Sequence, residues 1–90
     1  MAEIYCRSEE TPWNVVDDEA VLLNLESGHY FSLNETARFV WERCDGKHNL
    51  EDILSELCRQ FEVTRKQAAA DIEKLTKELL EEGLLVRQEA

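Results

Sequence analysis

The sequence predicts an α+β, winged-helix-like domain in which a three-stranded antiparallel sheet is followed by a three-helix bundle. Two features of the chain support this prediction. Before residue 34 the apolar residues alternate with a period of two, and from Glu35 onward they recur about every 3.6 residues. The connections between the expected helices are short, as in helix-turn-helix proteins.

The first two expected strands lie in the β-rich run WNVV, which begins at Trp13, and in residues 20–25. In the second of these, Val21, Leu23 and Leu25 share one face. Glu26, Ser27 and Gly28 supply the turn of a hairpin.

The third expected strand lies in the stretch GHYFSLN, residues 28–34, and its outer edge has no predicted partner. Because side chains alternate along a strand, Tyr30 and Ser32 share one face, and Phe31 and Leu33 share the other. One of the two aromatic residues therefore faces the core, and the other is available to a ligand.

Polar residues are placed to cap the first turn of each expected helix. Asn34 precedes the first helix, Asn49 precedes the second, and Thr64 with Gln67 makes a capping box for the third. The chain thus indicates three separate helices.

Each of these helices has an apolar stripe that predicts a buried face. The stripes consist of Ala37, Val40, Trp41 and Cys44; of Leu50, Ile53, Leu54, Leu57, Cys58 and Phe61; and of Ala68, Ile72, Leu75 and Leu79. The first helix is expected to end near Asp45 and Gly46 and the third at Gly83, since glycine suits the left-handed position after a helix. Residues 84–86 then pack back or pair as a short strand.

Residues 1–12 mix apolar and polar side chains and are expected to form a loose N-terminal arm. Residues 13–90 are expected to form a single domain, because no linker, repeat or low-complexity tract interrupts them.

The composition disfavours several classes of function. With 90 residues and 43% apolar residues, the chain supports one modest core but no deep catalytic cleft, so we expect a protein that is not an enzyme. Twenty acidic residues against ten basic ones give a net charge of −10, which repels nucleic acids and anionic membranes. No apolar run approaches the roughly 18 residues of a membrane span. A cytoplasmic protein without nucleic-acid or membrane partners is therefore expected.

The cysteines and histidines give no pattern typical of a metal or cofactor site. Cys6, Cys44 and Cys58 are widely spaced and include no CxxC pair, and neither His29 nor His48 lies in a ligand motif. We expect no metal, no cofactor and structural roles for these residues.

The run VLLNLESGHYFSLNETARFVWERCDG, followed by two amphipathic helices, resembles the PqqD family. The resemblance extends from about Trp13 to Val86 and is most specific at three short segments. These are Leu33-Asn34, Asp45-Gly46 and Gly83-Leu84-Leu85. The turn formed by residues 26–28 departs from the Pro-containing turn of members that act in coenzyme PQQ synthesis, so the particular pathway stays open.

The resemblance implies a RiPP recognition element, a non-catalytic peptide chaperone that binds the leader of a ribosomally made precursor peptide and presents it to a modifying enzyme. In PQQ biosynthesis that enzyme is a radical SAM protein. The leader would add as a strand along the third strand, with its side chains in the groove beside the third helix. The expected peptide-binding residues are Tyr30, Phe31, Ser32, Leu33, Asp71, Lys74, Leu75 and Glu78.

Two other classes of function stay open. One is a scaffold subunit that binds a modifying enzyme without reading a peptide. The other is a winged-helix nucleic-acid-binding regulator, which the charge disfavours because the segment from Arg65 to Glu82 has four basic and five acidic residues. The sequence also leaves open whether the free third strand pairs with a second copy in a homodimer.

Overall fold

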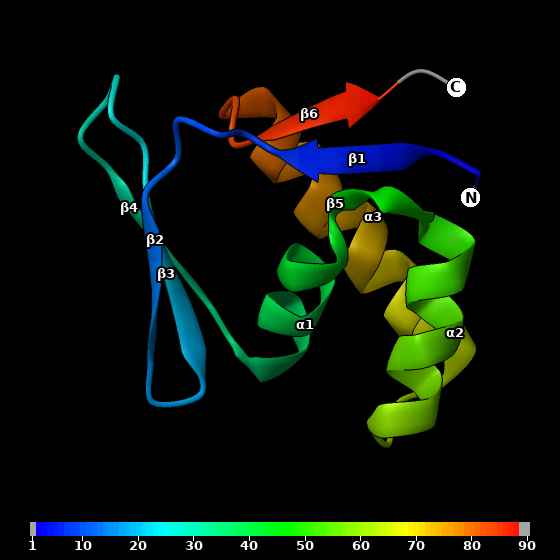
Figure 1. Ribbon diagram of the computed structural model, residues 1–90. Helices are drawn as coiled ribbons and strands as arrows, with labels where there is room; N and C mark the ends of the chain where they lie inside the picture. The colour runs from blue at the N-terminus through cyan, green and yellow to red at the C-terminus, as the bar shows by residue number, and fades with distance from the viewer. Residues whose placement is uncertain (1, 89–90) are drawn as a thin grey trace.

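The computed structural model describes residues 2–88, which form two three-stranded antiparallel sheets and three helices (Figure 1). The strands are β1 (Ile4–Arg7), β2 (Trp13–Val16), β3 (Glu19–Leu23), β4 (Tyr30–Leu33), β5 (Asp45–Asn49) and β6 (Leu85–Gln88). The helices are α1 (Glu35–Arg43), α2 (Leu50–Gln60) and α3 (Arg65–Glu81). The α+β prediction is therefore confirmed. Within residues 2–88, no helix is long and apolar enough to cross a membrane.

The first sheet has the order β2-β3-β4 and is the sheet that the sequence predicted. Its strands are neighbours in the sequence and are joined by two hairpins. On β3 the buried side chains are Ala20 and Leu22, which lie beside Leu33 of β4 in the core. The face shared by Val21 and Leu23 is the opposite one and is only partly buried.

The second sheet has the order β5-β1-β6 and was not predicted as a sheet. The expectation of a loose arm is wrong for residues 4–7, because β1 is the central strand and pairs with both neighbours. Tyr5 places its side chain in the core. Of the two alternatives for residues 84–86, the strand is correct, since Leu85 and Val86 pair with Arg7 and Cys6.

Side-chain caps begin the three helices as predicted. Asn34 Oδ1 accepts the N–H of Ala37 at 2.9 Å, and Asn49 Oδ1 accepts the N–H of Asp52 at 2.8 Å. Thr64 Oγ1 accepts the N–H of Gln67 at 3.1 Å. In a full capping box the Gln67 side chain would accept the N–H of Thr64. Here the Gln67 amide instead donates to Asp71.

The two predicted glycine stops have different outcomes. Gly83 ends α3 with φ of +74°, and Leu84 donates its N–H to the carbonyl of Leu79 in a Schellman motif. Helix α1 ends earlier than expected, at Arg43, and Gly46 lies within β5. Its φ of +83° accompanies a bulge between β5 and β1, so this glycine shapes a sheet and not a helix end.

Helix α1 and Arg7 connect the two sheets. Trp41 of α1 is fully buried, and its ring meets that of Trp13 from β2 edge to face at 5.9 Å. The Arg7 guanidinium donates to the carbonyls of Trp41 and Glu42, at 3.0 and 2.6 Å, and lies over the Trp13 ring. Trp41 and Arg7 thus hold the first sheet against α1 through Trp13.

Candidate functional site

The outer edge of β4 is open along the described chain, because β3 is the only strand that pairs with it. Phe31 and Leu33 turn toward the core, and Leu33 is buried there. Tyr30 is 71% exposed, and Ser32 is also exposed. The aromatic residue available to a ligand is therefore Tyr30 and not Phe31.

The backbone groups of β4 alternate between the ladder with β3 and the open edge. Asn24 donates its N–H to the carbonyl of His29 at 2.9 Å, which fixes this facing pair as a hydrogen-bonded one. Because such pairs alternate in an antiparallel ladder, Phe31 and Leu33 bond to Leu22 and Ala20. The N–H and C=O groups of Tyr30 and Ser32 consequently point to the open edge.

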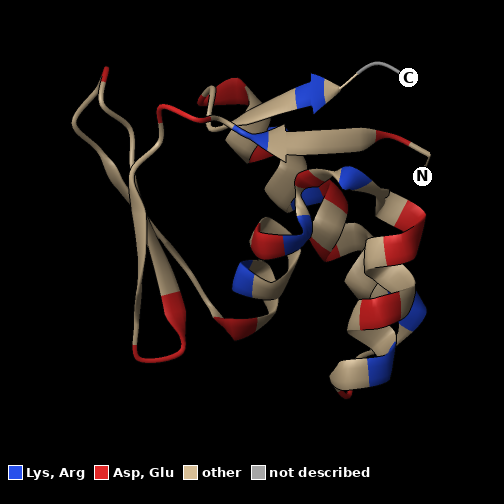
Figure 2. Cartoon of the chain, in the orientation of Figure 1, with Lys and Arg blue, Asp and Glu red and all other residues tan. Residues whose placement is uncertain are grey.

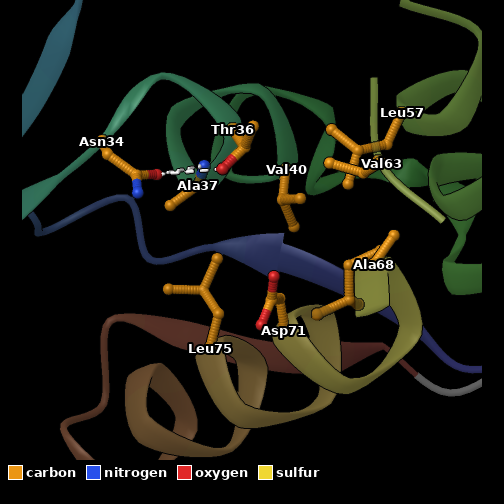
Figure 3. Close-up of a pocket in the computed structure, with 10 residues that line it drawn as sticks. Asn34, Thr36, Ala37, Val40, Leu57, Val63, Ala68, Asp71 and Leu75 are labelled. Atoms are coloured by element: carbon orange, nitrogen blue, oxygen red, sulfur yellow. Dashed lines mark hydrogen bonds between the residues drawn. The ribbon is translucent and has the colours of Figure 1, made fainter. Parts of the chain in front are cut away.

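A pocket of about 210 Å³ begins directly after β4, between α1 and α3. Its apolar lining comes from three helices and the α2–α3 loop. These residues are Ala37, Val40, Leu57, Val63, Ala68, Ile72 and Leu75. Figure 3 shows the α1 side chains on one side of the pocket and those of α3 on the other. A pocket of this size accommodates one or two apolar side chains.

Polar groups border this pocket at Asn34, Thr36 and Asp71. The capping bond holds Asn34 Oδ1, which also accepts from the Thr36 hydroxyl at 3.0 Å. The Asn34 amide N–H₂ is therefore turned away from the helix backbone (Figure 3). Asp71 is exposed and accepts one bond from the Gln67 amide, so its carboxylate remains accessible to a cation.

The expected helix residues divide into two groups. Asp71 and Leu75 line the pocket, and Leu75 also packs against the core, as its place in the apolar stripe predicts. Lys74 and Glu78 are exposed on α3 but do not line the pocket. The structure therefore brings two of these four residues to the groove.

Most of the apolar lining is not predicted by the sequence as part of a site. The apolar stripes predict Val40 and Leu57 as core residues, and no pattern predicts a role for Val63 in the α2–α3 loop. The sequence does place Asn34 and Thr36 near a ligand on the open strand, because Asn34-Glu35-Thr36 directly follows that strand and begins α1. A residue that both packs in a core and lines a pocket has the same periodicity as an ordinary core residue.

Two observations describe the titratable groups outside this site. Burial raises the pKa of the Cys44 thiol to about 12, so the thiol stays protonated at neutral pH. Within residues 2–88, no group of three or more His, Cys, Asp or Glu side chains converges as a metal site would require.

The fold and the site define a small α+β domain that offers one open strand edge beside an apolar pocket with a polar border. The family described as Coenzyme PQQ synthesis protein D (PqqD) matches residues 19–85, and this chain belongs to that family. The match includes the open strand, the pocket and all three helices. It excludes β1 and β2.

Named relatives and solved structures agree with this assignment. A protein described as PqqA binding protein, from Methylococcus capsulatus, is 36% identical over 72 residues, which is 80% of this chain and 69% of that protein. The structure of TbiB1 in complex with the TbiA(beta) leader peptide has a TM-score of 0.80 at 26% identity, covering 94% of this chain and 99% of that one. Lasso peptide synthetase B1 complexed with the leader peptide has a TM-score of 0.79 at 32% identity, covering 91% and 96%.

Proposed function

We propose that this protein is a non-catalytic peptide-binding chaperone that binds the leader of a ribosomally made precursor peptide and presents it to a modifying enzyme. The open edge of β4 beside the apolar pocket is the observation that supports this function most strongly. The two solved relatives were determined with leader peptides bound, and the curated relative is described as binding PqqA.

In this proposal the leader adds to β4 as a further strand. The outward N–H and C=O groups of Tyr30 and Ser32 pair with the peptide main chain, which gives affinity with little demand on sequence. Because Asn34 directly follows β4, a peptide along this edge has side chains within reach of the pocket. The apolar lining then selects apolar leader side chains.

Charged residues on α3 supply a second source of selectivity. Asp71 borders the pocket and would attract a Lys or Arg of the leader. Lys74 and Glu78 lie farther along the exposed side of the helix and would meet the ends of a longer peptide. Exposed ion pairs contribute only about 0 to 1 kcal/mol each, so these residues adjust specificity and the strand edge supplies affinity.

The partner enzyme belongs to the same proposal. We expect a radical SAM protein or another peptide-modifying enzyme, in PQQ biosynthesis or in a related RiPP pathway, acting with this protein in the cytoplasm. Use of the β4 edge by a leader also means that a homodimer formed through this edge would compete with the peptide.

The nucleic-acid alternative has weak support in the distribution of charge. Three arginines pair with glutamates in the described chain: Arg38 with Glu42, Arg43 with Glu56, and Arg65 with Glu51. Figure 2 shows that Lys and Arg are scattered over the chain, and on α3 they are interspersed with acidic residues. Phosphate binding requires such a concentration of positive charge.

The function is tested with synthetic leader peptides from precursor genes adjacent to this gene, titrated into the ¹⁵N-labelled protein. Binding should shift the amide signals of residues 30–33 and of the pocket. Ser32→Pro removes an outward N–H and should weaken leader affinity roughly tenfold or more while the domain stays folded.

Phe31→Pro is the matched control, because the Phe31 N–H points to β3. That variant should lose stability as well as binding. Normal leader binding by a folded Ser32→Pro protein would contradict strand addition at β4. Binding of the adjacent enzyme, with no response to any neighbouring leader, would favour the scaffold alternative.

A further inference from the structure

The first sheet has a second open edge, at β2. The sheet order is β2-β3-β4, and within residues 2–88 the only strand that pairs with β2 is β3. All four β2 residues are exposed, and three of them are large and apolar. Trp13 and Val15 are each 37% exposed, and Val16 is 53% exposed.

The register determines which backbone groups lie on this edge. Leu23 donates its N–H to the carbonyl of Pro12 at 3.0 Å, so this facing pair belongs to the hydrogen-bonded set. The alternation then assigns Asn14 and Val16 to the ladder with β3 and leaves the N–H and C=O groups of Trp13 and Val15 facing outward.

A side-chain bond agrees with this assignment. The Val15 N–H donates to Oδ1 of Asn14 at 3.0 Å instead of bonding across to β3. The bond is local and exposed, so a strand with a better acceptor can displace it. Asn14 therefore satisfies an edge donor while the edge is unoccupied.

Acidic residues lie at both ends of β2, as Figure 2 shows. Glu9 and Glu10 precede the strand, and Asp17, Asp18 and Glu19 follow it, all of them exposed. Arg7 of β1 lies over the Trp13 ring and carries one positive charge, which these five carboxylates outnumber. An incoming strand with Lys or Arg at both ends is therefore attracted.

The same charges disfavour a second copy of this chain as the occupant. Two β2 strands paired antiparallel would bring Asp17 and Asp18 of each copy toward Glu9 and Glu10 of the other. Like charges opposed in this way are destabilising.

We propose that the β2 edge is a second strand-addition surface, which receives an extended segment of a partner protein that has alternating apolar residues flanked by Lys or Arg. The occupant is protein main chain, paired with Trp13 and Val15, and Asn14 must release the Val15 N–H for it to bind. This proposal is independent of leader binding at β4, because the two edges lie on opposite sides of β3. A sheet occupied on both edges would have five strands.

The test uses a synthetic heptapeptide, acetyl-KTVTVTK-amide, titrated into the ¹⁵N-labelled full chain without any leader. We expect saturable shifts of the Trp13 and Val15 amides with a dissociation constant of about 1 mM. Asn14→Ala frees the Val15 donor and should tighten binding about threefold. The acidic control, acetyl-ETVTVTE-amide, should bind at least about tenfold more weakly because its ends are repelled.

A second control leaves the protein unchanged and N-methylates both valines of the basic peptide, which removes donors that pair with an edge. Loss of the shifts supports main-chain pairing. The proposal is overturned by an absence of shifts at Trp13 and Val15, by shifts at Tyr30 and Ser32 alone, or by equal binding of the acidic peptide. It is also overturned if Asn14→Ala weakens binding, or if the protein alone shows concentration-dependent shifts at β2, which would identify a second copy as the occupant.

Discussion

The two sheets are similar in size but differ in how the chain forms them. The β2-β3-β4 sheet consists of residues 13–33, joined by hairpins, and its β4 edge leads directly to the apolar pocket. The β5-β1-β6 sheet gathers three segments that are distant in sequence and places them side by side (Figure 1). The second sheet thus joins the two ends of the described chain to its middle, and we propose that the first sheet offers its backbone to other chains.

A pair of tyrosines tests this division with the largest expected effect. Tyr5 lies in the central strand of the second sheet and is 8% exposed, whereas Tyr30 lies at the edge of the first and is 71% exposed. Tyr5→Ala should lower the free energy of unfolding by about 3 kcal/mol, since it removes a buried aromatic side chain. Tyr30→Ala should change it by less than about 0.5 kcal/mol and weaken leader binding instead. Urea denaturation measures the free energy of unfolding of both variants, and peptide titration measures their leader affinity. Equal destabilisation by the two substitutions would contradict different roles for the two sheets.

Arg7 provides a second test, because it links the second sheet to α1 and to Trp13 of the first. Arg7→Lys keeps the charge but loses the planar group that donates to the Trp41 and Glu42 carbonyls. We expect about 2 kcal/mol of destabilisation, the usual range for hydrogen bonds of a charged donor. The control is Arg59→Lys on the exposed side of α2, which should be nearly neutral. Denaturation midpoints that match for the two variants would argue against Arg7 as the connection.

Two left-handed glycines sharpen the comparison further: Gly46 lies in β5 of the second sheet, and Gly28 lies in the loop that joins β3 to β4 of the first. Gly46→Ala would strain a φ of +83° and place a Cβ 2.5 Å from Oε1 of Gln88. Gly28→Ala strains a φ of +77° but meets no atom within 4 Å. Each strain costs about 1 kcal/mol, and the Gly46 variant should lose slightly more because the flexible end of the exposed Gln88 side chain must also move. Thermal unfolding measures this difference, which would have the wrong sign if Gly28→Ala were the less stable variant.

The smallest effect concerns pH and the bulged strand β5. Burial acts to raise the pKa of Asp45, but the Lys47 N–H and the His48 ring outweigh it and lower that pKa below its usual value. A lowered folded-state pKa contributes stability above the unfolded-state pKa of about 3.9, and this stability is lost as pH falls through the folded-state pKa. Asp45→Asn should therefore be less stable than the wild type at pH 7, with a gap that narrows at pH 3. A gap that stays constant between these two pH values in urea denaturation would exclude this contribution.

The first sheet and the helices were predictable because their signals are local. Alternation over residues 30–33 identified β4, and Asn34, Asn49 and Thr64 marked the helix starts that the structure confirms. The open outer edge followed from the absence of a further strand beside it in the sequence.

The second sheet was not predictable because its pairing depends on segments more than 35 residues apart. The sequence DGKHN of β5 has the composition of a turn, and it becomes a strand only because β1 lies beside it. The pocket has the same difficulty, since Val40, Leu57 and Ile72 have ordinary core periodicity and only their packing leaves space between α1 and α3.

Amide hydrogen exchange is the most direct test of whether Tyr30 and Ser32 offer their backbone to a leader peptide. In the free protein, the amides of Phe31 and Leu33 should exchange slowly, and those of Tyr30 and Ser32 quickly. A saturating leader peptide should slow hydrogen exchange of the Tyr30 and Ser32 amides by about tenfold or more. The exchange rates of the amides that bond between β3 and β4 should stay unchanged. Binding of the leader while both amides continue to exchange at the free rate would contradict the account.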